Sequence, residues 1–305
     1  MLILNSYHGK VLESLIELSL REARIRSNYK WNEETKDFFT QELKKSNHNH
    51  YSKYIFSILG MYLPQFIYLD KDWVFDNFNK IFDLEISNFW ECSTYCYFKR
   101  LTRFDVRIYD KLKEGNHLKE IFKDKPYKKA VDIVIITYMN SHDKFLLEIL
   151  NNQEEEFYER LSWFVERNYK EDSRYCEKIK TLIKNINNKN LKYFSNWITF
   201  FDSLDDEFLE IFKVAFKNRD PKYGFRDSKT LENFIKISEK SADKISELYL
   251  EMVREGIIFI FPDKKVRDFF EKLKEKGEKN NLVTILKIYS KNGYYNFNDI
   301  VKDLG

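Results

Sequence analysis

Apolar residues recur at three- and four-residue spacing along almost the whole of this 305-residue chain, and this periodicity constrains the fold more than any other feature. Such spacing places the apolar residues on one face of an α-helix, which must then be buried. In the segment 4–24 the residues predicted to share the buried face are Val11, Leu12, Leu15, Ile16, Ser19 and Ala23. Asn5 or Ser6 can cap this helix by accepting a hydrogen bond from its first turn, and Gly9 leaves room for a close neighbour.

Few residues force the chain to leave the helical state, because it contains only 8 Gly and 4 Pro. Gly256, Gly277 and Gly293 each follow a helical segment directly, and a glycine in that place usually caps the helix in a left-handed conformation. We therefore predict an all-α fold: an irregular α-solenoid of antiparallel helix pairs, similar to tetratricopeptide and HEAT repeats. The sequence lacks a strict period such as the ~34 residues of tetratricopeptide repeats, so the repeat is expected to be degenerate.

The length corresponds to about two domains. We expect an N-terminal helical-repeat part at 1–125 and a C-terminal part at 126–305, together forming one continuous superhelix. The apolar stretch "VDIVIITYM" at 131–139 is predicted to be a fully buried helix or strand. The stretch "GIIFIFP" at 256–262 is predicted to be a buried extended linker, with at most a token strand.

Composition bears on the cellular compartment and on whether the chain can fold. The net charge of +3 is small, and the three cysteines do not make a disulfide framework, so a reducing, cytoplasmic setting is expected. No apolar run approaches the ~20 residues that a membrane span needs. The N-terminus has no signal-peptide pattern. The aromatic share of 17% excludes a disordered chain.

Motifs that carry chemistry are missing from the sequence. The phosphate-binding G-x-x-x-x-G-K-[ST], the G-x-S-x-G nucleophile turn, H-E-x-x-H and G-x-G-x-x-G do not occur. The acidic runs at 154–156 and 205–207 fall at predicted helix starts, where the helix dipole explains them without catalysis. We therefore expect no catalytic residues, no cofactor and no enzymatic activity in this chain.

Two residue pairs could in principle bind a metal. Cys92 and Cys96 lie four residues apart on a predicted helix, and His48 and His50 lie in a predicted loop. A structural zinc ion needs four ligands, and no further pair stands at ligand spacing. The favoured interpretation is small buried side chains for the cysteines and polar loop residues for the histidines, so no metal is expected.

The segment 99–129 is strongly basic. It contains eleven basic and five acidic residues, a net charge of +6. Arg100, Arg103 and Arg107 stand at helical spacing, and with Lys111 they are the candidate partner-binding residues. They could form one ridge that binds an acidic surface of a protein. The alternative is an ordinary solvated helix face.

Several stretches resemble one family. The segment 4–24, "LNSYHGKVLESLIELSLREAR", resembles the "NS-x-R-G-x-A-L-E-A-L-I" stretch in the C-terminal helical-repeat regions of bacterial STAND-type NTPases of antiviral defence, the Avs class. The segment 57–82 is similar to their glycine followed by a leucine-aspartate-x-x-tryptophan-valine run. The segments 194–218 and 285–301 are similar to their later and terminal helices.

The resemblance implies a function. In that family the helical region senses a phage protein, such as a large terminase subunit or a portal, and triggers ATPase-driven oligomerisation and an upstream effector. This chain departs from the pattern at the usual arginine, where His8 stands before Gly9. If His8 replaces that arginine, it should make a structural contact in the first helical turn. Any NTPase or effector domain would lie outside this chain, which would be only the sensing part of a longer protein.

A second hypothesis keeps the fold and changes the role. The chain could be a stand-alone α-solenoid scaffold that binds a host protein or a nucleic acid. Binding to nucleic acid should weaken steeply with salt, because neutralised phosphates release counterions. A protein ligand is the favoured partner class and nucleic acid the less favoured one. An enzymatic function ranks third.

Overall fold

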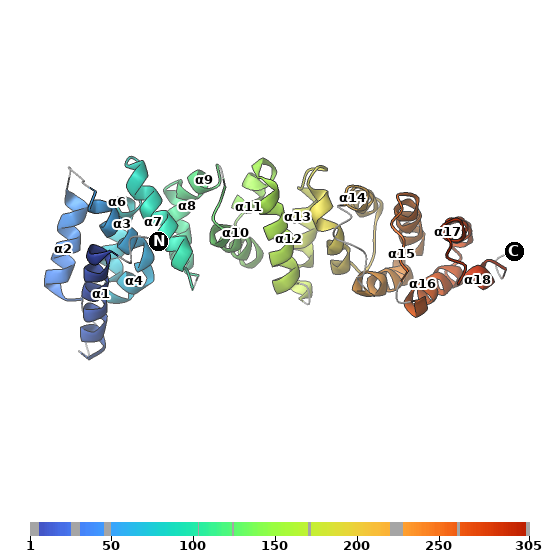
Figure 1. Ribbon diagram of the computed structural model, residues 1–305, viewed down its shortest axis with the longest axis horizontal. Coiled ribbons are helices and arrows are strands. Elements are labelled where there is room, and N and C mark those ends of the chain that lie inside the picture. Colours follow the sequence, from blue (N-terminus) through green and yellow to red (C-terminus); the bar gives the residue numbers. More distant parts are fainter. Residues whose placement is uncertain are drawn as a thin grey trace. The chain divides into compact units, whose positions relative to one another are not determined.

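The computed structural model describes residues 6–25, 31–45, 50–102, 104–123, 125–169, 172–219, 228–260 and 263–302. These residues form helices, turns and bends, and no β-strand occurs among them (Figure 1). The all-α prediction is therefore confirmed. The chain divides into two compact units after Thr137, within the helix α10 (Lys128–Asn140). The boundary expected from the sequence, between residues 125 and 126, lies just before that helix. The continuous superhelix stays a prediction.

The helices of the first unit are α1 (Tyr7–Ile25), α2 (Glu33–Lys44), α3 (Ser52–Met61), α4 (Leu63–Leu69), α5 (Lys71–Asp76), α6 (Phe78–Ile81), α7 (Ser87–Arg100), α8 (Val106–Glu114) and α9 (His117–Ile121). The division falls within α10 (Lys128–Asn140). The α-helices of the second unit are α11 (Phe145–Ile149), α12 (Glu155–Tyr169), α13 (Cys176–Lys184), α14 (Asp206–Lys217), α15 (Ser228–Arg254), α16 (Asp263–Glu275), α17 (Lys279–Lys291) and α18 (Asn298–Lys302). Its 3-10 helices are η1 (Leu150–Asn152), η2 (Ser173–Tyr175) and η3 (Leu191–Phe200).

The start of α1 agrees with its sequence. Ser6 Oγ accepts a hydrogen bond of 3.0 Å from the Gly9 amide, which is the predicted N-cap. The buried face of this helix is narrower than predicted. Leu12, Ile16, Ser19 and Ala23 are buried, whereas Leu15 is only half-buried. Val11 is 43% exposed, so its assignment to the buried face is wrong. It lies at the edge of the stripe that packs on the neighbouring helices.

The contact between α3 and α7 is the closest helix packing in the first unit. A Cβ atom placed on Gly60 would lie 2.0 Å from the backbone oxygen of Ser93. Ser93 in turn donates from its hydroxyl to the backbone oxygens of Ile81 and Phe56, at 2.6 and 3.2 Å. The missing side chain of Gly60 therefore lets two helix backbones touch.

The three predicted glycine stops share one geometry. Gly256, Gly277 and Gly293 have φ angles of 81°, 88° and 84°. After each helix the glycine amide donates to the carbonyl three residues back, and the next amide donates to the carbonyl five residues before itself. This is the Schellman pattern, which a glycine adopts at low conformational cost. The predicted helix ends are thus confirmed.

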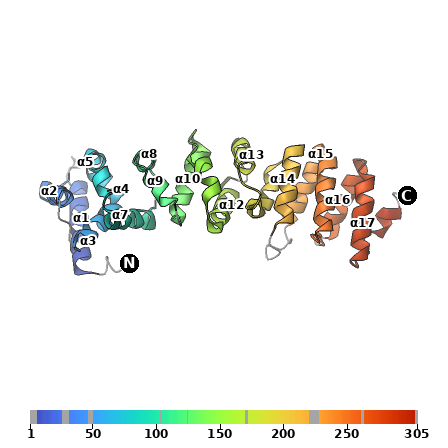
Figure 2. The same cartoon turned by 90° about the horizontal axis from the view of Figure 1, so that it is seen from above.

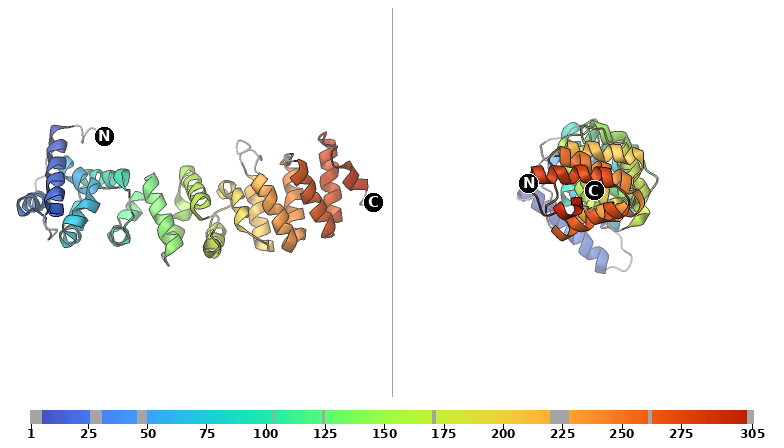
Figure 3. Two further views of the ribbon diagram at one scale, coloured as in Figure 1. Left: turned by 90° about the horizontal axis from the view of Figure 1, so that it is seen from below. Right: turned by 90° about the vertical axis from the view of Figure 1, so that its right-hand side faces the viewer.

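Helices of the second unit contact one another at a regular distance along the chain. The helix α15 bends at Ser241, whose φ and ψ of −143° and 55° are not helical, so it acts as two successive helices. In Figures 2 and 3, α14, α15, α16 and α17 lie side by side. Six hydrogen bonds in this part of the chain join residues that are 32 to 37 positions apart, and the one between Tyr249 on α15 and Tyr289 on α17 joins residues 40 positions apart. Contacts of similar sequence separation therefore recur among these helices, and the solenoid arrangement stays a prediction.

The segment 257–260 follows α15 without helical structure or strand pairing, and the described part of "GIIFIFP" is buried at Phe259 and half-buried at its neighbours. Phe259 in this segment is buried, and two buried tyrosines bind its backbone. Tyr249 Oη accepts a hydrogen bond of 3.1 Å from the Phe259 amide, and Tyr289 Oη donates to the Phe259 carbonyl at 2.7 Å. The two hydroxyl groups are also hydrogen-bonded to each other. Burial raises the pKa of both tyrosines, so both stay protonated.

The apolar stretch at 131–139 is a helix rather than a strand, because it lies within α10. The end of that helix is capped by Lys178, whose Nζ donates to the backbone oxygens of Tyr138, Met139 and Ser141 at 2.8, 2.9 and 2.5 Å. A cation at a helix C-terminus satisfies carbonyls that have no partner within the helix.

In the described part of the chain, every helix is too short or too polar to cross a lipid bilayer.

Candidate protein-binding surfaces

The basic ridge predicted from the sequence does not lie on one helix. The helix α7 ends at Arg100 and α8 begins at Val106, with Asp105 as its N-cap. Arg100 and Arg107 therefore belong to different helices, and their helical spacing in the sequence does not give one continuous ridge. Arg103 lies outside the described residues.

Two of the four candidate residues already have acidic partners in the chain. Arg107 Nη2 lies 2.6 Å from Asp105 Oδ2, and Arg107 Nε donates to Oδ1 of the same carboxylate at 3.0 Å. This guanidinium holds the pKa of Asp105 below its usual value. Lys111 Nζ lies 2.9 Å from Glu114 Oε2. Arg100 is exposed and has no ion pair among the described residues, so it is the candidate whose charge is most available.

A groove of about 350 Å³ opens between α1, α2 and α3 in the first unit. Leu12 and Ile55 are buried, while the aromatic side chains around the groove reach solvent. The exposed fractions of the lining residues Tyr7, Val11, Phe38 and Tyr51 are 80%, 43%, 36% and 46%. Large hydrophobic side chains that gather at one exposed place are typical of interaction sites. We call these four residues, with His8, the aromatic groove.

His8 lies in the first turn of α1 and contacts two tyrosines of the groove wall. Its ring centroid is 4.7 Å from that of Tyr51 and 5.6 Å from that of Tyr54, with the second pair stacked. His8 therefore makes side-chain contacts from the first helical turn, and its equivalence to the arginine of the Avs-class pattern stays a prediction. Glu42 and Lys45 complete the lining and pair with each other, so they leave little net charge.

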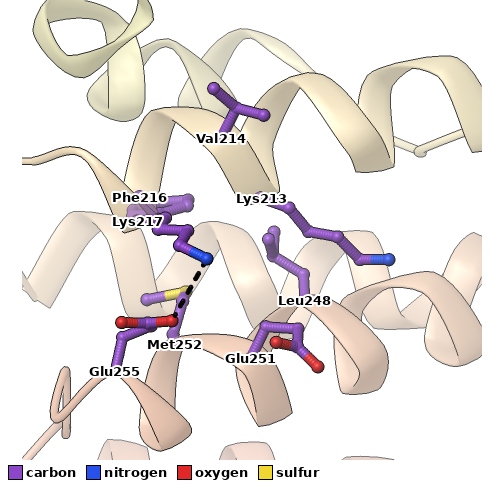
Figure 4. A pocket seen from close by; sticks show the side chains of 8 residues that line it. All are labelled: Lys213, Val214, Phe216, Lys217, Leu248, Glu251, Met252 and Glu255. Carbon is purple, nitrogen blue, oxygen red and sulfur yellow. Dashed lines mark ion pairs between the residues drawn. The ribbon is translucent and has the colours of Figure 1, made fainter.

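A second hollow, of about 300 Å³, lies between α14 and the second half of α15 (Figure 4). Lys217 faces Glu255 across it, with 3.7 Å between Nζ and Oε1. Lys213 pairs with Glu247 at 2.6 Å. Because these lysine charges are balanced inside the chain, this hollow is less suited than the aromatic groove to recognise a ligand.

One tryptophan of the second unit is exposed. Trp163, on α12, is 45% exposed, and the guanidinium carbon atoms of Arg160 and Arg167 lie 4.4 and 5.2 Å from its ring centroid. We call these three residues the Arg–Trp–Arg cluster. Arginine held over an indole face is attracted by the negative face of the ring.

Comparison with known proteins adds no relative. No protein-family model matches this chain, and no curated protein and no solved structure matches it either.

The cysteine and histidine pairs do not form a recognisable metal site in the described residues. No group of three or more His, Cys, Asp or Glu side chains there could hold a metal ion. Burial raises the pKa of the Cys92 and Cys96 thiols, which disfavours the thiolate form that binds metals. His50 is exposed and its ring lies 3.8 Å from that of Tyr51, whereas His48 lies outside the described residues.

His117 is the one buried histidine among the described residues. Its Nδ1 accepts a hydrogen bond of 3.2 Å from Trp90 Nε1, so this nitrogen must be unprotonated. The rings of Phe78 and Phe82 lie against the His117 ring. Burial lowers the pKa of His117, whereas the negative charge of Asp83 raises this pKa. Burial has the larger effect and lowers the pKa of His117 below 6.5.

We expect His117 to make the first unit less stable in weak acid. The unfolded chain takes up the proton near pH 6.5, while the folded chain takes it up only at lower pH. In that interval the unfolded state binds more protons, so the free energy of unfolding falls as pH falls, by at most about 1.4 kcal/mol per pH unit. Urea unfolding between pH 7.5 and 5 measures this dependence. His117→Asn keeps an acceptor near Nδ1 and cannot titrate, so its curve should be flatter. Parallel curves for the two proteins would contradict this assignment.

The aromatic groove and the Arg–Trp–Arg cluster were not predicted from the sequence. A signal for the cluster was present: the buried face of α12 contains Phe157, Leu161 and Val165, and Trp163 falls between positions of that stripe. The groove had no such signal, because it combines residues from three helices that are distant in the sequence.

Proposed function

We propose that this chain is a protein-binding helical region without catalytic activity of its own, and that its ligand is a phage protein. In this proposal the chain is the ligand-sensing region of an antiphage defence protein and works in the cytoplasm. The observation that carries the proposal is the aromatic groove, with its exposed Tyr7 and Tyr51.

Apolar surface that is exposed to water costs free energy, which a binding partner recovers when it covers that surface. Tyr7, Val11, Phe38 and Tyr51 expose large side chains around a concave, apolar floor, where a partner could bury them. Tyrosine contributes a large rigid contact area and a hydroxyl group, and it is enriched at the energetic centres of protein interfaces. The small net charge of the groove favours a protein ligand over a polyanion.

The choice of a phage protein rests on the resemblance of the sequence to the helical-repeat regions of Avs-class proteins. One part of that resemblance lies at the groove, and another lies in the core of the first unit. His8, at the position of the family's arginine, contacts the groove tyrosines. The leucine-aspartate-x-x-tryptophan-valine run provides Asp70, whose side chain caps α5, and Trp73, which is buried in the core.

The test is capture of proteins from lysates of phage-infected and uninfected bacteria. We expect the parent chain to retain a phage-encoded protein from the infected lysate. The groove variant Tyr7→Ser/Tyr51→Ser should reduce its recovery at least about tenfold, since removal of interface anchors typically costs more than about 1.4 kcal/mol. The matched control is Tyr95→Ser/Tyr295→Ser, which changes two tyrosines that are 43% and 63% exposed and do not line the groove.

Two results of this assay decide the proposal, and a third tests the basic segment. Equal recovery by the groove variant and the control would exclude the groove. Failure of the parent to retain any phage protein, when joined to the rest of its natural chain, would contradict the sensing function itself. Charge reversal of Arg100, Arg103 and Arg107 to Glu tests the basic segment in the same way, and unchanged recovery would exclude it from the interface.

A further inference from the structure

Trp163 is exposed in a protein that otherwise buries its tryptophans. The other four, Trp31, Trp73, Trp90 and Trp197, are between 0% and 9% exposed, whereas Trp163 is 45% exposed. The indole is the largest side chain, and leaving it in water forgoes the free energy that its burial would provide. Exposed tryptophan is also the residue type most enriched among the binding hot spots of protein surfaces.

The arginines on either side give this surface a defined chemistry. Arg160 and Arg167 stand three residues before and four residues after Trp163 on α12, so all three side chains lie along one helix face. Both guanidinium groups lie over the indole, at 4.4 and 5.2 Å from its centroid. Arg167 has no ion pair among the described residues, so its N–H donors can bind a carboxylate from outside.

We propose that the Arg–Trp–Arg cluster is a docking site for an acidic segment of a protein, in which an apolar or aromatic side chain stands next to carboxylates. The apolar side chain packs on the exposed indole, and a carboxylate binds the guanidinium of Arg167 through two parallel hydrogen bonds. Arg160, 4.4 Å from the centroid, helps to hold the indole in place. The indole and the guanidinium thereby recognise two different features of the same segment.

Nearby charges favour a protein over a nucleic acid. Glu159 and Glu166 stand four residues before and three residues after Trp163, so carboxylates flank the cluster on the same helix. A continuous phosphate backbone would be repelled by them, whereas a peptide can place single carboxylates beside the arginines. This inference rests on the proposed protein-binding function, but it concerns a surface separate from the aromatic groove and does not require a phage ligand.

The test measures binding of a fluorescein-labelled random copolymer of glutamate and tyrosine by anisotropy, with polyglutamate and oligothymidine as comparison probes. We expect the copolymer to bind the parent chain more tightly than either comparison probe. Trp163→Ala should weaken binding about 30-fold and Arg167→Gln about tenfold, which are hot-spot magnitudes. Trp163→Phe, which retains an aromatic face, should recover part of the affinity.

Arg174→Gln is the matched control, because Arg174 is exposed in the same unit, lies over a tyrosine ring, and is paired with Asp172. It removes the same charge and should change the affinity less than twofold. Absence of copolymer binding by the parent would overturn the proposal, as would binding by Trp163→Ala equal to that of the parent. Tighter binding of oligothymidine would assign the surface to nucleic acid instead. Copolymer binding that survives Tyr7→Ser/Tyr51→Ser, while phage-protein capture is lost, separates this site from the groove.

Discussion

Gly60→Ala is expected to destabilise the first unit severely, by at least about 3 kcal/mol. The added methyl carbon would lie 2.0, 2.7 and 2.8 Å from the oxygen, carbonyl carbon and Cα of Ser93. These are backbone atoms of α7, so no side-chain rotation can make room for the methyl group. The helices would have to separate, which breaks the hydrogen bond of the Ser93 hydroxyl to the Phe56 carbonyl of α3.

Urea unfolding followed by circular dichroism measures this effect, and Gly277→Ala is the control. At Gly277 an added Cβ would have no atom within 4 Å, but its φ of 88° is unfavourable for alanine. That substitution should therefore cost only about 1 to 2 kcal/mol, from backbone strain alone. A cost for Gly60→Ala no larger than that of the control would show that α3 and α7 do not touch in this way.

Tyr289→Phe is expected to cost the second unit about 2 to 4 kcal/mol. The substitution preserves the ring and its packing but removes the hydroxyl group that donates to the Phe259 carbonyl at 2.7 Å. It also removes the hydrogen-bond partner of the Tyr249 hydroxyl. Two buried polar groups then lose a partner where water cannot replace it.

A double-variant cycle tests whether the two tyrosines act together. Tyr249→Phe should be similarly costly, because it leaves the Phe259 amide without its acceptor. The double variant should cost less than the sum of the two single variants, since each removes part of one network. The control is Tyr95→Phe, at a tyrosine that is 43% exposed, which should change stability by less than about 0.5 kcal/mol. Single-variant costs as small as that would contradict the network.

The features that the sequence predicted correctly depend on local chemistry. Ser6 caps α1 and Gly256 ends α15 because hydrogen bonds within a few residues decide both. Helical periodicity also predicted which segments of the chain form helices. For "VDIVIITYM" it left a helix and a strand as alternatives, and the helix is the one that forms. Their buried faces were less certain: the pattern placed Val11 inside, but the width of the stripe depends on how neighbouring helices pack.

The features that the sequence could not predict depend on contacts between distant residues. Nothing near Gly60 in the sequence indicates that Ser93 touches it. The binding of Phe259 by two tyrosines involves residues up to 40 positions apart. The predicted basic ridge is not continuous for a related reason. The helix α7 ends at Arg100, and this break interrupts a spacing that looks continuous in the sequence. The aromatic groove, which the proposed function uses, is likewise a product of tertiary structure.

The aromatic groove is proposed to bind a phage protein, and crosslinking in infected cells can detect that contact at a single residue. A photo-crosslinking phenylalanine derivative replaces Tyr51 in one variant and the exposed Tyr295 in another, each expressed in bacteria that are then infected with phage. After infection and illumination we expect position 51 to become linked to a phage-encoded protein, while position 295 and uninfected cells should give no such product. Equal crosslinking from both positions, or no phage-encoded protein linked to position 51, would contradict the proposal.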